Sequence, residues 1–357
     1  MAKKILFFHL LNNFTGSPQV LRNVIEVAKL EGHQVELYTS SGTGFLSGIS
    51  GIRYRSNFYY RSNIRLITLV TFFMSQVFLM GKLLRHRKED CLFYVNTILP
   101  FSAIWMGKML GKKVIVHVHE YEISPKILSR FLFWVVRSWA DQIVVVSRFL
   151  AINPALGSRK SLVIHNSVKK EIEEEAVVFV PEKKSKSVLM LASLRPYKGI
   201  YEFVELAKRL PKLDFDLILS DSSEDVEKWK SGLNITPNLH IWPVQKEVVP
   251  WYKQAFLVLN LAHPDKWLET FGMTILEGMH FGVPAIVPTK GGVTELIEYG
   301  INGYLVDYTD LDKIEELIRK IDSSEELWKQ LGAKAKEKAQ DFTGRKFSSE
   351  IRNLLSA

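Results

Sequence analysis

The feature that most constrains the fold is an alternation of short apolar runs with segments of helical periodicity, repeated along the chain. Residues 5–11 predict a strand, Ser17-Pro18 predicts the start of a helix, and residues 35–38 predict the next strand. Such a strand–helix–strand unit joins parallel strands. Further short strands are predicted at residues 91–95, 114–118, 142–147, 162–164, 188–192, 215–219, 239–242, 257–260, 285–287 and 303–306. The sequence therefore predicts an α/β fold with parallel sheets.

A charged, helix-breaking segment divides this alternation into two series. Residues 171–187 contain three consecutive glutamates and then Pro181-Glu182-Lys183-Lys184, which is typical of a linker. We therefore expect an N-terminal domain over residues 1–170, completed by a C-terminal helix over 341–357, and a C-terminal domain over 188–340. The last part of this second domain, residues 311–340, has the periodicity of an amphipathic helix. The expected ligand site is a cleft between these two α/β domains.

Composition excludes several protein classes. Hydrophobic residues make up 47% and charged residues 24% of the 357, so the chain is neither disordered nor collagen-like. The single cysteine, Cys91, allows no disulfide framework and fits a reducing compartment. The basic and apolar start imitates a signal peptide, but His9 and Asn12-Asn13 interrupt it, which favours a buried first strand and a cytoplasmic location.

The positive charge is concentrated in the first half of the chain. Residues 1–180 hold 23 Lys+Arg and 12 Asp+Glu, a net charge of +11, whereas residues 181–357 hold 24 and 26, a net charge of −2. This asymmetry indicates an anionic partner for the N-terminal domain, either nucleic acid or a membrane surface. No recognisable nucleic-acid-binding motif is present, so we expect an anionic membrane and a peripheral position on its inner face.

One stretch is unusually apolar. The 15 residues 66–80 include no charged side chain, and basic residues flank them on both sides. Because a spanning helix needs about 20 such residues, two interpretations stay open. The segment is either a buried helix of the first domain or a helix partly sunk in the membrane interface.

The most specific motif is a pair of glutamates, Glu269 and Glu277, eight residues apart around a Phe-Gly turn. Gly282 and Pro284 end the short helix that follows this turn. Free N–H groups around Gly272, Met273 and Thr274 predict a phosphate site at the start of the helix. Carboxylates accept hydrogen bonds from paired sugar hydroxyls, so both glutamates can address one ligand; the alternative is two unrelated surface glutamates.

This stretch, with Gly291-Gly292-Val293-Thr294-Glu295 after it, resembles the donor-binding signature of the retaining family 4 glycosyltransferases of the GT-B fold. Agreement continues in order along nearly the whole chain, including Gly16 in the first strand-to-helix loop and Lys198-Gly199 after the first strand of the second domain. The resemblance implies two Rossmann-like domains facing each other across a cleft.

The resemblance also implies roles for individual donor-site residues. Glu277 would hold the ribose hydroxyls of a nucleotide sugar, and Glu269 would contact the sugar ring. The backbone of Phe271, Gly272, Met273 and Thr274 would bind sugar hydroxyls and the distal phosphate, and Gly16 would also contribute to the donor site.

Three further residues complete the catalytic set implied by the resemblance. Lys198 would neutralise the leaving diphosphate, and His119 would lie against the donor sugar; the alternatives are a solvated loop lysine and a core histidine. The arginine that usually precedes this lysine is replaced by Ser193, and we carry its role over to Arg195 because a shift of two residues keeps the same strand face.

Three other patterns are given structural interpretations. His117 and His119 share a strand face, but no third ligand is apparent, so we predict no metal. Asp214 and Asp216 lie at the start of a strand, away from the ligand end of a parallel sheet. The glycines of residues 42–51 precede no helix and are expected in a loop near the acceptor.

The function implied is retaining, metal-independent transfer of a hexose-type sugar from a nucleotide sugar, UDP-linked in preference to GDP-linked. The acceptor would be a glycan or a polyprenyl- or glycolipid-linked saccharide, in surface polysaccharide assembly such as O-antigen or capsule. No other cofactor and no nucleic acid are expected. The alternatives are a nucleotide-sugar epimerase of the same fold and a non-catalytic nucleotide-sugar-binding protein.

Overall fold

The computed structural model describes residues 2–62, 64–181 and 187–357. The chain divides into two compact units, the first comprising residues 1–166 and 347–357 and the second residues 167–346. Each unit is built on one sheet whose paired strands are all parallel. The prediction of two Rossmann-like α/β domains is confirmed.

The sheet of the first unit has seven strands in the order β3-β2-β1-β4-β5-β6-β7. The chain thus starts in the middle, builds to one edge, and returns to build the other edge, so the order reverses between β1 and β4. Ligands bind at such a reversal point in open α/β sheets. The strands are β1 Lys4–Phe8, β2 Gln34–Ser40, β3 Arg53–Asn57, β4 Cys91–Asn96, β5 Val114–Val118, β6 Gln142–Val145 and β7 Ser161–Val163.

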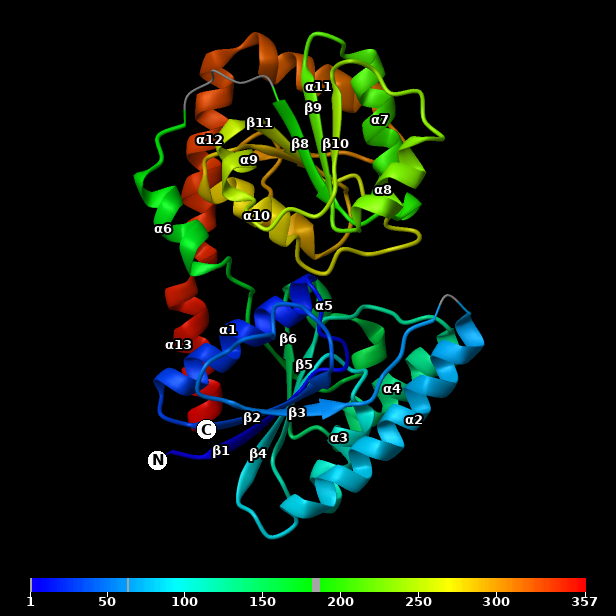
Figure 1. The fold of residues 1–357 in the computed structure, drawn as a ribbon. Helices are drawn as coiled ribbons and strands as arrows, with labels where there is room; N and C mark the ends of the chain where they lie inside the picture. The colour runs from blue at the N-terminus through cyan, green and yellow to red at the C-terminus, as the bar shows by residue number, and fades with distance from the viewer. Residues whose placement is uncertain (1, 63, 182–186) are drawn as a thin grey trace. The chain divides into compact units, whose positions relative to one another are not determined.

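Helices cover both faces of this sheet (Figure 1). Ile5 and Phe7 of β1 pack with α1 and with Phe347 and Ile351 of α13, so the end of the chain joins the core of the first unit. The helices of this unit are α1 Gly16–Leu30, α2 Arg65–Leu83, α3 Phe101–Met109, α4 Lys126–Trp139, α5 Arg148–Ala151 and most of α13 Gly344–Ser356.

The sheet of the second unit has six strands in the order β10-β9-β8-β11-β12-β13, which reverses between β8 and β11. Its strands are β8 Ser187–Ala192, β9 Asp214–Leu219, β10 Leu239–Trp242, β11 Ala255–Leu259, β12 Ala285–Val287 and β13 Gly303–Leu305. Its helices are α6 Lys170–Val178, α7 Ile200–Arg209, α8 Ser223–Lys230, α9 Val249–Gln254, α10 Met273–His280, α11 Leu311–Ser323 and α12 Glu325–Ala339. Short 3₁₀ turns occur at η3 Pro196–Lys198 and η4 Gly292–Leu296.

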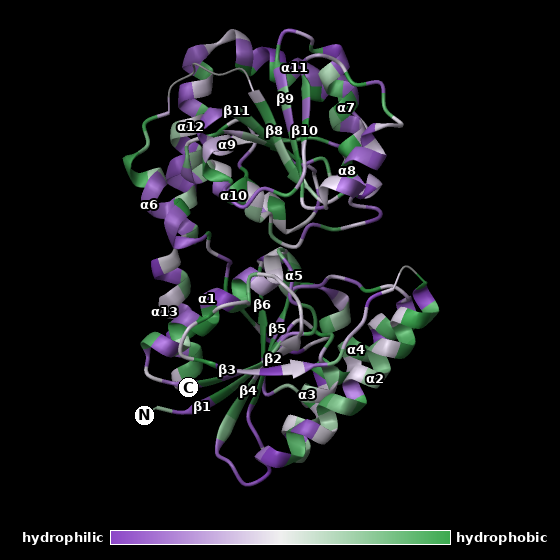
Figure 2. Cartoon of the chain, in the orientation of Figure 1, coloured by the Kyte–Doolittle hydropathy of each residue, from purple (hydrophilic) through white to green (hydrophobic). Residues whose placement is uncertain are grey.

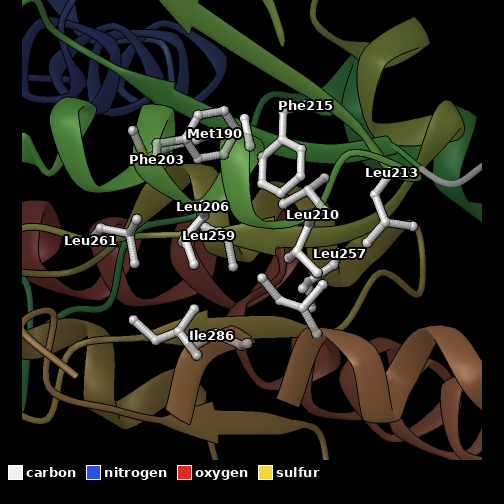
Figure 3. Close-up of a cluster of buried hydrophobic side chains, with 14 of the residues drawn as sticks. Met190, Phe203, Leu206, Leu210, Leu213, Phe215, Leu257, Leu259, Leu261 and Ile286 are labelled. Carbon is white, nitrogen blue, oxygen red and sulfur yellow. The ribbon is translucent and has the colours of Figure 1, made fainter. Parts of the chain in front are cut away.

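A continuous apolar core holds these helices on the second sheet. Met190 of β8, Phe203 of α7 and Phe215 of β9 lie in it, with Leu257 of β11 and Ile286 of β12 (Figure 3). All five side chains are fully or almost fully buried. Burial of such side chains contributes about 1.5–3 kcal/mol each, which fixes the strand ends that carry the site.

The strand β3 was not predicted, because its sequence shows no apolar alternation. It is an edge strand, and Arg53 and Arg55 lie on it at alternate positions. Both guanidinium groups face the buried carboxylate of Glu36 on β2, at 3.9 and 2.7 Å. Ion pairs with Glu36 therefore hold β3 in the sheet, whereas apolar packing holds the other strands.

The predicted linker is wrong for its first part. Residues 170–178 form α6, whose Ile172 and Ala176 are buried and which packs against α10 inside the second unit. The domain boundary accordingly lies at residues 166 and 167 rather than at 170. Residues 182–186 of the predicted linker lie outside the described residues.

The predicted helix over residues 311–340 is divided into α11 and α12. Ser324 interrupts it, and its hydroxyl accepts a hydrogen bond from the backbone N–H of Leu327 at 3.1 Å. A serine in this position caps the second helix.

The apolar segment of residues 66–80 forms most of α2, and the interpretation as a buried helix holds for only one of its two faces. Phe72, Gln76 and Leu79 are buried, whereas Leu66, Val77 and five other apolar side chains are exposed. Among the described residues, Arg65–His86 is the one helical stretch long and apolar enough to cross a membrane, and 28% of its apolar 18-residue window is buried.

Candidate functional site

The second unit brings Lys198 and Glu269 into direct contact. Lys198 ends the η3 turn after β8, and Glu269 lies in the loop between β11 and α10. Because β8 and β11 are neighbours at the reversal of strand order, residues 71 positions apart meet at the carboxyl edge of the sheet. Lys198 Nζ donates a hydrogen bond to Glu269 Oε2 at 2.9 Å. Both side chains are about one-fifth exposed, so a ligand can reach them.

Aromatic rings support the lysine. Lys198 Nζ lies 5.1 Å from the ring centroid of Trp267, which stacks on Tyr197 with the centroids 5.6 Å apart. A cation over an aromatic ring is attracted to its electron-rich face. This packing restricts the lysine side chain, so its charge is directed before any ligand arrives. Neither ring was singled out as a support for Lys198 from the sequence.

Glycines in the surrounding loops have positive φ angles that residues with a side chain rarely adopt. Gly272, before α10, has φ +102°, and Gly291, before η4, has φ +117° and ψ 172°. A Cβ on Gly291 would lie 2.7 Å from the carbonyl oxygen of Glu269. That oxygen accepts a 2.6 Å hydrogen bond from the Gly292 N–H. The backbone at Glu269 is therefore fixed by a contact that only glycine permits.

This contact predicts that Gly291→Ala destabilises the protein by about 3 kcal/mol or more, because backbone strain adds to a clash with a carbonyl oxygen. Gly300→Ala is the matched control: Gly300 has φ +75° and nothing within 4 Å of an added Cβ, so its cost is only about 1 kcal/mol. Thermal unfolding of both variants measures the difference. Equal midpoints would show that the contact with Glu269 does not constrain this loop.

Glu277 lies within α10 and is almost fully buried. Its Oε2 accepts a hydrogen bond from the Tyr252 hydroxyl at 2.7 Å. Burial raises the pKa of Glu277 to about 7, although the Tyr252 hydrogen bond and the nearby Lys169 act in the opposite direction. The carboxylate is thus partly protonated near neutral pH. Tyr252, on α9, was missed because no local motif links it to Glu277.

The start of α10 offers backbone donors. Met273 and Thr274 form its first turn, where no preceding carbonyl can accept their N–H groups. Phe271 turns its side chain into the core and packs on Phe342 with the ring centroids 5.8 Å apart. The predicted glycine turn and helix start therefore lie where the sequence placed them.

Arg195 is not brought into contact with Lys198 and Glu269 by its side chain. It is exposed, and its carbonyl accepts the Lys198 N–H at 2.9 Å. In the described part of the chain, no ion pair of its guanidinium group is found. Its role on the ligand remains a prediction.

His119 and Gly16 lie in the first unit, near the reversal of its strand order. His119 follows β5, and its Nε2 donates to Asn96 Oδ1 at the end of β4, at 2.9 Å. The Asn96 amide group donates to His9 Nδ1 and to the Ser17 carbonyl, both at 3.0 Å. Gly16 begins α1 beside Ser17. Asn96, at the end of β4, thus joins the β1–α1 connection to the loop after β5, and the sequence alone did not single it out.

The chemistry of this cluster follows from burial. Burial lowers the pKa of His119 well below its ordinary value, and His117, whose ring centroid is 4.5 Å away, acts in the same direction. His119 therefore stays neutral and acts as a hydrogen-bonding group. Burial raises the pKa of Glu120 to about 7. Over residues 2–62, 64–181 and 187–357, no group of three or more His, Cys, Asp or Glu side chains could hold a metal ion.

Asp214 and Asp216 lie at the amino end of β9, where they were predicted. Asp216 accepts hydrogen bonds from the Trp242 indole N–H at 3.1 Å and from the Ser187 hydroxyl. Both contacts tie neighbouring strands together.

The glycines of residues 42–51 lie in a loop, as predicted. Asn12 Nδ2 donates a hydrogen bond to the Gly42 carbonyl in this loop, at 2.8 Å.

Comparisons with known proteins identify relatives of this chain among glycosyltransferases. Residues 171–338 match the family described as glycosyl transferases group 1. The chain is 28% identical to an N-acetyl-alpha-D-glucosaminyl L-malate synthase of Bacillus anthracis, over 47% of this chain and 45% of that protein. It is 27% identical to an uncharacterized glycosyltransferase of Methanocaldococcus jannaschii, over 73% and 74%.

Among solved structures, the Anabaena protein HepE in complex with UDP and glucose superposes with a TM-score of 0.79 at 17% identity. The match covers 99% of this chain and all of that one. At this identity the likeness shows a common fold.

Proposed function

We propose that this chain, which has the GT-B fold and whose residues 171–338 match the glycosyl transferases group 1 family, transfers a hexose-type sugar from a nucleotide sugar to an acceptor hydroxyl with retention at the anomeric carbon. The observation that carries this proposal is the contact between Lys198 and Glu269 at the strand reversal of the second unit. A cation and a carboxylate meet there beside the start of α10, so one ligand with a phosphate end and a sugar end can be held.

The cation serves the leaving group. As the bond between the anomeric carbon and the diphosphate oxygen breaks, negative charge grows on the diphosphate. Lys198 and the N–H groups of Met273 and Thr274 then bind it more tightly than in the ground state, which lowers the barrier. The acceptor oxygen bonds to the anomeric carbon on the same face, and its proton passes to the departing diphosphate. In this route these groups neutralise the charge, and we propose no catalytic metal.

The carboxylates serve recognition. Glu277 accepts hydrogen bonds from the two ribose hydroxyls, and Glu269 contacts hydroxyls of the donor sugar while it orients Lys198. The UDP and glucose held by the HepE structure support a uridine donor in preference to a guanosine donor. The structure of HepE in complex with UDP-glucose supports a nucleotide sugar as the donor.

The first unit is assigned to the acceptor, and His119 to the donor sugar. The net charge of +11 over residues 1–180 favours a glycan acceptor carried on a polyprenyl or glycolipid at the inner face of the membrane. Such acceptors belong to surface polysaccharide assembly. Gly16, at the start of α1, is assigned to the donor site as well.

The proposal is tested with UDP, GDP, ADP and their glucose conjugates. We expect UDP and UDP-glucose to raise the midpoint of thermal unfolding, since a ligand that binds only the folded state stabilises it. We also expect slow release of UDP from UDP-glucose with water as acceptor, giving glucose of retained anomeric configuration. No thermal shift with any nucleotide would refute the donor assignment.

Product analysis separates the two alternatives. With donor alone, an epimerase would release a free product that carries the epimerised sugar, without any acceptor. A non-catalytic binding protein would show the thermal shift with neither hydrolysis nor transfer. The close contact between Lys198 and Glu269 favours catalysis over both, because it places a cation where a leaving group develops charge.

A further inference from the structure

The outward face of α2 is an apolar surface that the fold leaves without a partner among the described residues. Its exposed side chains recur at helical spacing and range from 41% to 69% exposed: Leu66, Ile67, Val70, Phe73, Met74, Val77 and Phe78. A shallow groove on this face is lined only by apolar side chains of α2 itself. Figure 2 colours most of the helix as hydrophobic. A contiguous apolar face of this kind marks an interaction site.

The surface continues onto α4 through a chain of aromatic contacts. Phe73 lies 6.2 Å from Phe101 of α3, and Phe101 lies 5.1 Å from Phe131 of α4, measured between ring centroids. Phe131 in turn contacts Trp134 at 6.2 Å. Phe131 and Trp134 are exposed, as is Ile127. We call these three residues and the seven of α2 the α2–α4 face.

Cations without acidic partners surround this face. Between Glu36 and Glu89 the sequence holds no Asp or Glu but eight Lys and Arg residues. At the ends of α2 these include Arg61, Arg65, Arg85, Arg87 and Lys88, all exposed. No ion pair joins these five to a carboxylate in the described parts of the chain.

The second unit shows the contrast. On α11 and α12, Lys313, Arg319, Lys329 and Lys334 each pair with a glutamate three or four residues away. These four cations of a solvated helix surface are thus neutralised locally, whereas the five around α2 have no such partner among the described residues. Unneutralised cations attract anionic headgroups, at about 1 kcal/mol for each residue near the surface.

From these observations we propose that the α2–α4 face docks on an anionic phospholipid bilayer, with α2 lying in the plane of the interface. A helix of 19 residues is about 28 Å long, and its apolar side chains would enter the region between headgroups and acyl chains while the terminal cations contact phosphates. The inference rests on the proposed function only in that a lipid-linked acceptor gives such a surface a use.

The buried face of α2 argues against a spanning helix. Gln76 accepts hydrogen bonds from the Ser102 N–H and hydroxyl on α3, at 3.2 and 2.9 Å. Phe72 and Leu79 are packed into the first unit on the same face. Crossing the bilayer would require α2 to leave α3, which would expose these polar groups to hydrocarbon at high cost.

A second copy of the chain fits the face less well than a bilayer does. In a symmetric dimer the same patch meets itself, so the cations of both copies would be brought together. Like charges at an interface oppose association. An anionic lipid surface supplies the missing charge.

The proposal is tested by flotation of the full-length protein with vesicles of phosphatidylcholine, with and without phosphatidylglycerol. We expect strong binding only with phosphatidylglycerol, and release by high salt. Leu66→Ser/Val77→Ser removes apolar contacts, and Arg85→Glu/Arg87→Glu reverses charge. Each double variant should reduce vesicle binding about tenfold or more, with the UDP-induced thermal shift unchanged.

Matched controls change equally exposed residues of the second unit. Val177→Ser/Val178→Ser alters two apolar side chains that are each 79% exposed, and Lys212→Glu/Lys320→Glu makes the same change in net charge. Both should bind vesicles as the wild type does. If the controls lose binding equally, the effect is one of general charge or hydrophobicity, and the α2–α4 face is not the docking site.

Other outcomes are also decisive. Binding independent of lipid charge, binding that resists salt and alkaline carbonate, or a dimer that Leu66→Ser/Val77→Ser dissociates without any vesicle binding would each overturn the proposal. Vesicle binding with no UDP response would contradict the proposed function and leave this inference standing. A UDP response without vesicle binding would leave the proposed function standing and overturn this inference.

Discussion

Lys198→Ala is expected to lower kcat for sugar transfer by about 10²–10³-fold, the loss typical when one preorganised donor to a developing negative charge is removed. The donor KM should change much less, because the interaction strengthens in the transition state rather than in the ground state. The folded state should be almost unaffected. Lys198 pairs with Glu269 at a partly exposed position, where an ion pair contributes about 1 kcal/mol or less.

Lys253→Ala provides a matched control for this prediction. Lys253 Nζ pairs with Glu175 at 2.6 Å and lies 5.9 Å from the Phe179 ring, so it has the same kinds of contact as Lys198. It lies at the end of α9, not at the carboxyl edge of the sheet. Steady-state kinetics with UDP-glucose should show near-normal turnover for this variant. Transfer by Lys198→Ala within about threefold of the wild type would remove Lys198 from the mechanism.

The strands were predictable to within a few residues because burial imposes a local pattern. Buried parallel strands are short apolar runs bounded by polar residues, and the runs at residues 188–192 and 239–242 become β8 and β10. The exposed edge strand β3 shows the limit of this signal, since Arg53 and Arg55 satisfy Glu36 instead of a core. A contact with a distant buried charge leaves no periodic trace in the sequence.

The candidate site was predictable in its residue types but not in its contacts. The spacing of Glu269 and Glu277 and the glycine at residue 272 are local features. The contact between Lys198 and Glu269 depends on β8 and β11 being neighbours, which the order of elements along the chain does not specify. Tyr252 contacts Glu277 from a different helix, and no local feature links the two.

The apolar segment of α2 shows a different limit. Hydropathy alone left a buried helix and an interfacial helix as open interpretations. The structure divides the segment between them, with Gln76 and Leu79 on the packed face and Val77 and Phe78 on the exposed one. Which face is packed depends on where α3 lies, so amphipathic position rather than mean hydropathy is the informative quantity.

The second large effect is expected at Glu277, whose ionisation should control donor affinity. Burial raises its pKa to about 7, so a large fraction is protonated at pH 6 and most is ionised at pH 8. Only the carboxylate can accept hydrogen bonds from both ribose hydroxyls with both oxygens. The affinity for UDP should therefore rise as the pH increases through about 7. Calorimetric titration of UDP between pH 5.5 and 8.5 measures this profile, and its midpoint should lie near the pKa of Glu277.

Glu277→Gln should lower the affinity for UDP at pH 8 by about 10–100-fold, since hydrogen bonds to a charged group contribute about 1.5–3 kcal/mol. The variant has no titrating group at this position, so its affinity should vary little around pH 7. The stability of Glu277→Gln relative to wild type should rise over the same pH range. A raised pKa in the folded state stabilises wild type below the unfolded value of about 4.5, and this advantage is lost as the pH rises through about 7.

Tyr252→Phe tests whether the ionisation of Glu277 sets the pH dependence of UDP affinity, because this variant keeps the carboxylate but changes its pKa. The Tyr252 hydroxyl donates to Glu277 and holds its pKa down, so removing it should move the midpoint of the UDP-affinity profile to higher pH while affinity well above the midpoint recovers. A purely structural role for Tyr252 would instead lower affinity equally at every pH. If wild type and Glu277→Gln show the same pH profile, the carboxylate of Glu277 does not bind the ribose, and the donor's nucleoside must be held elsewhere.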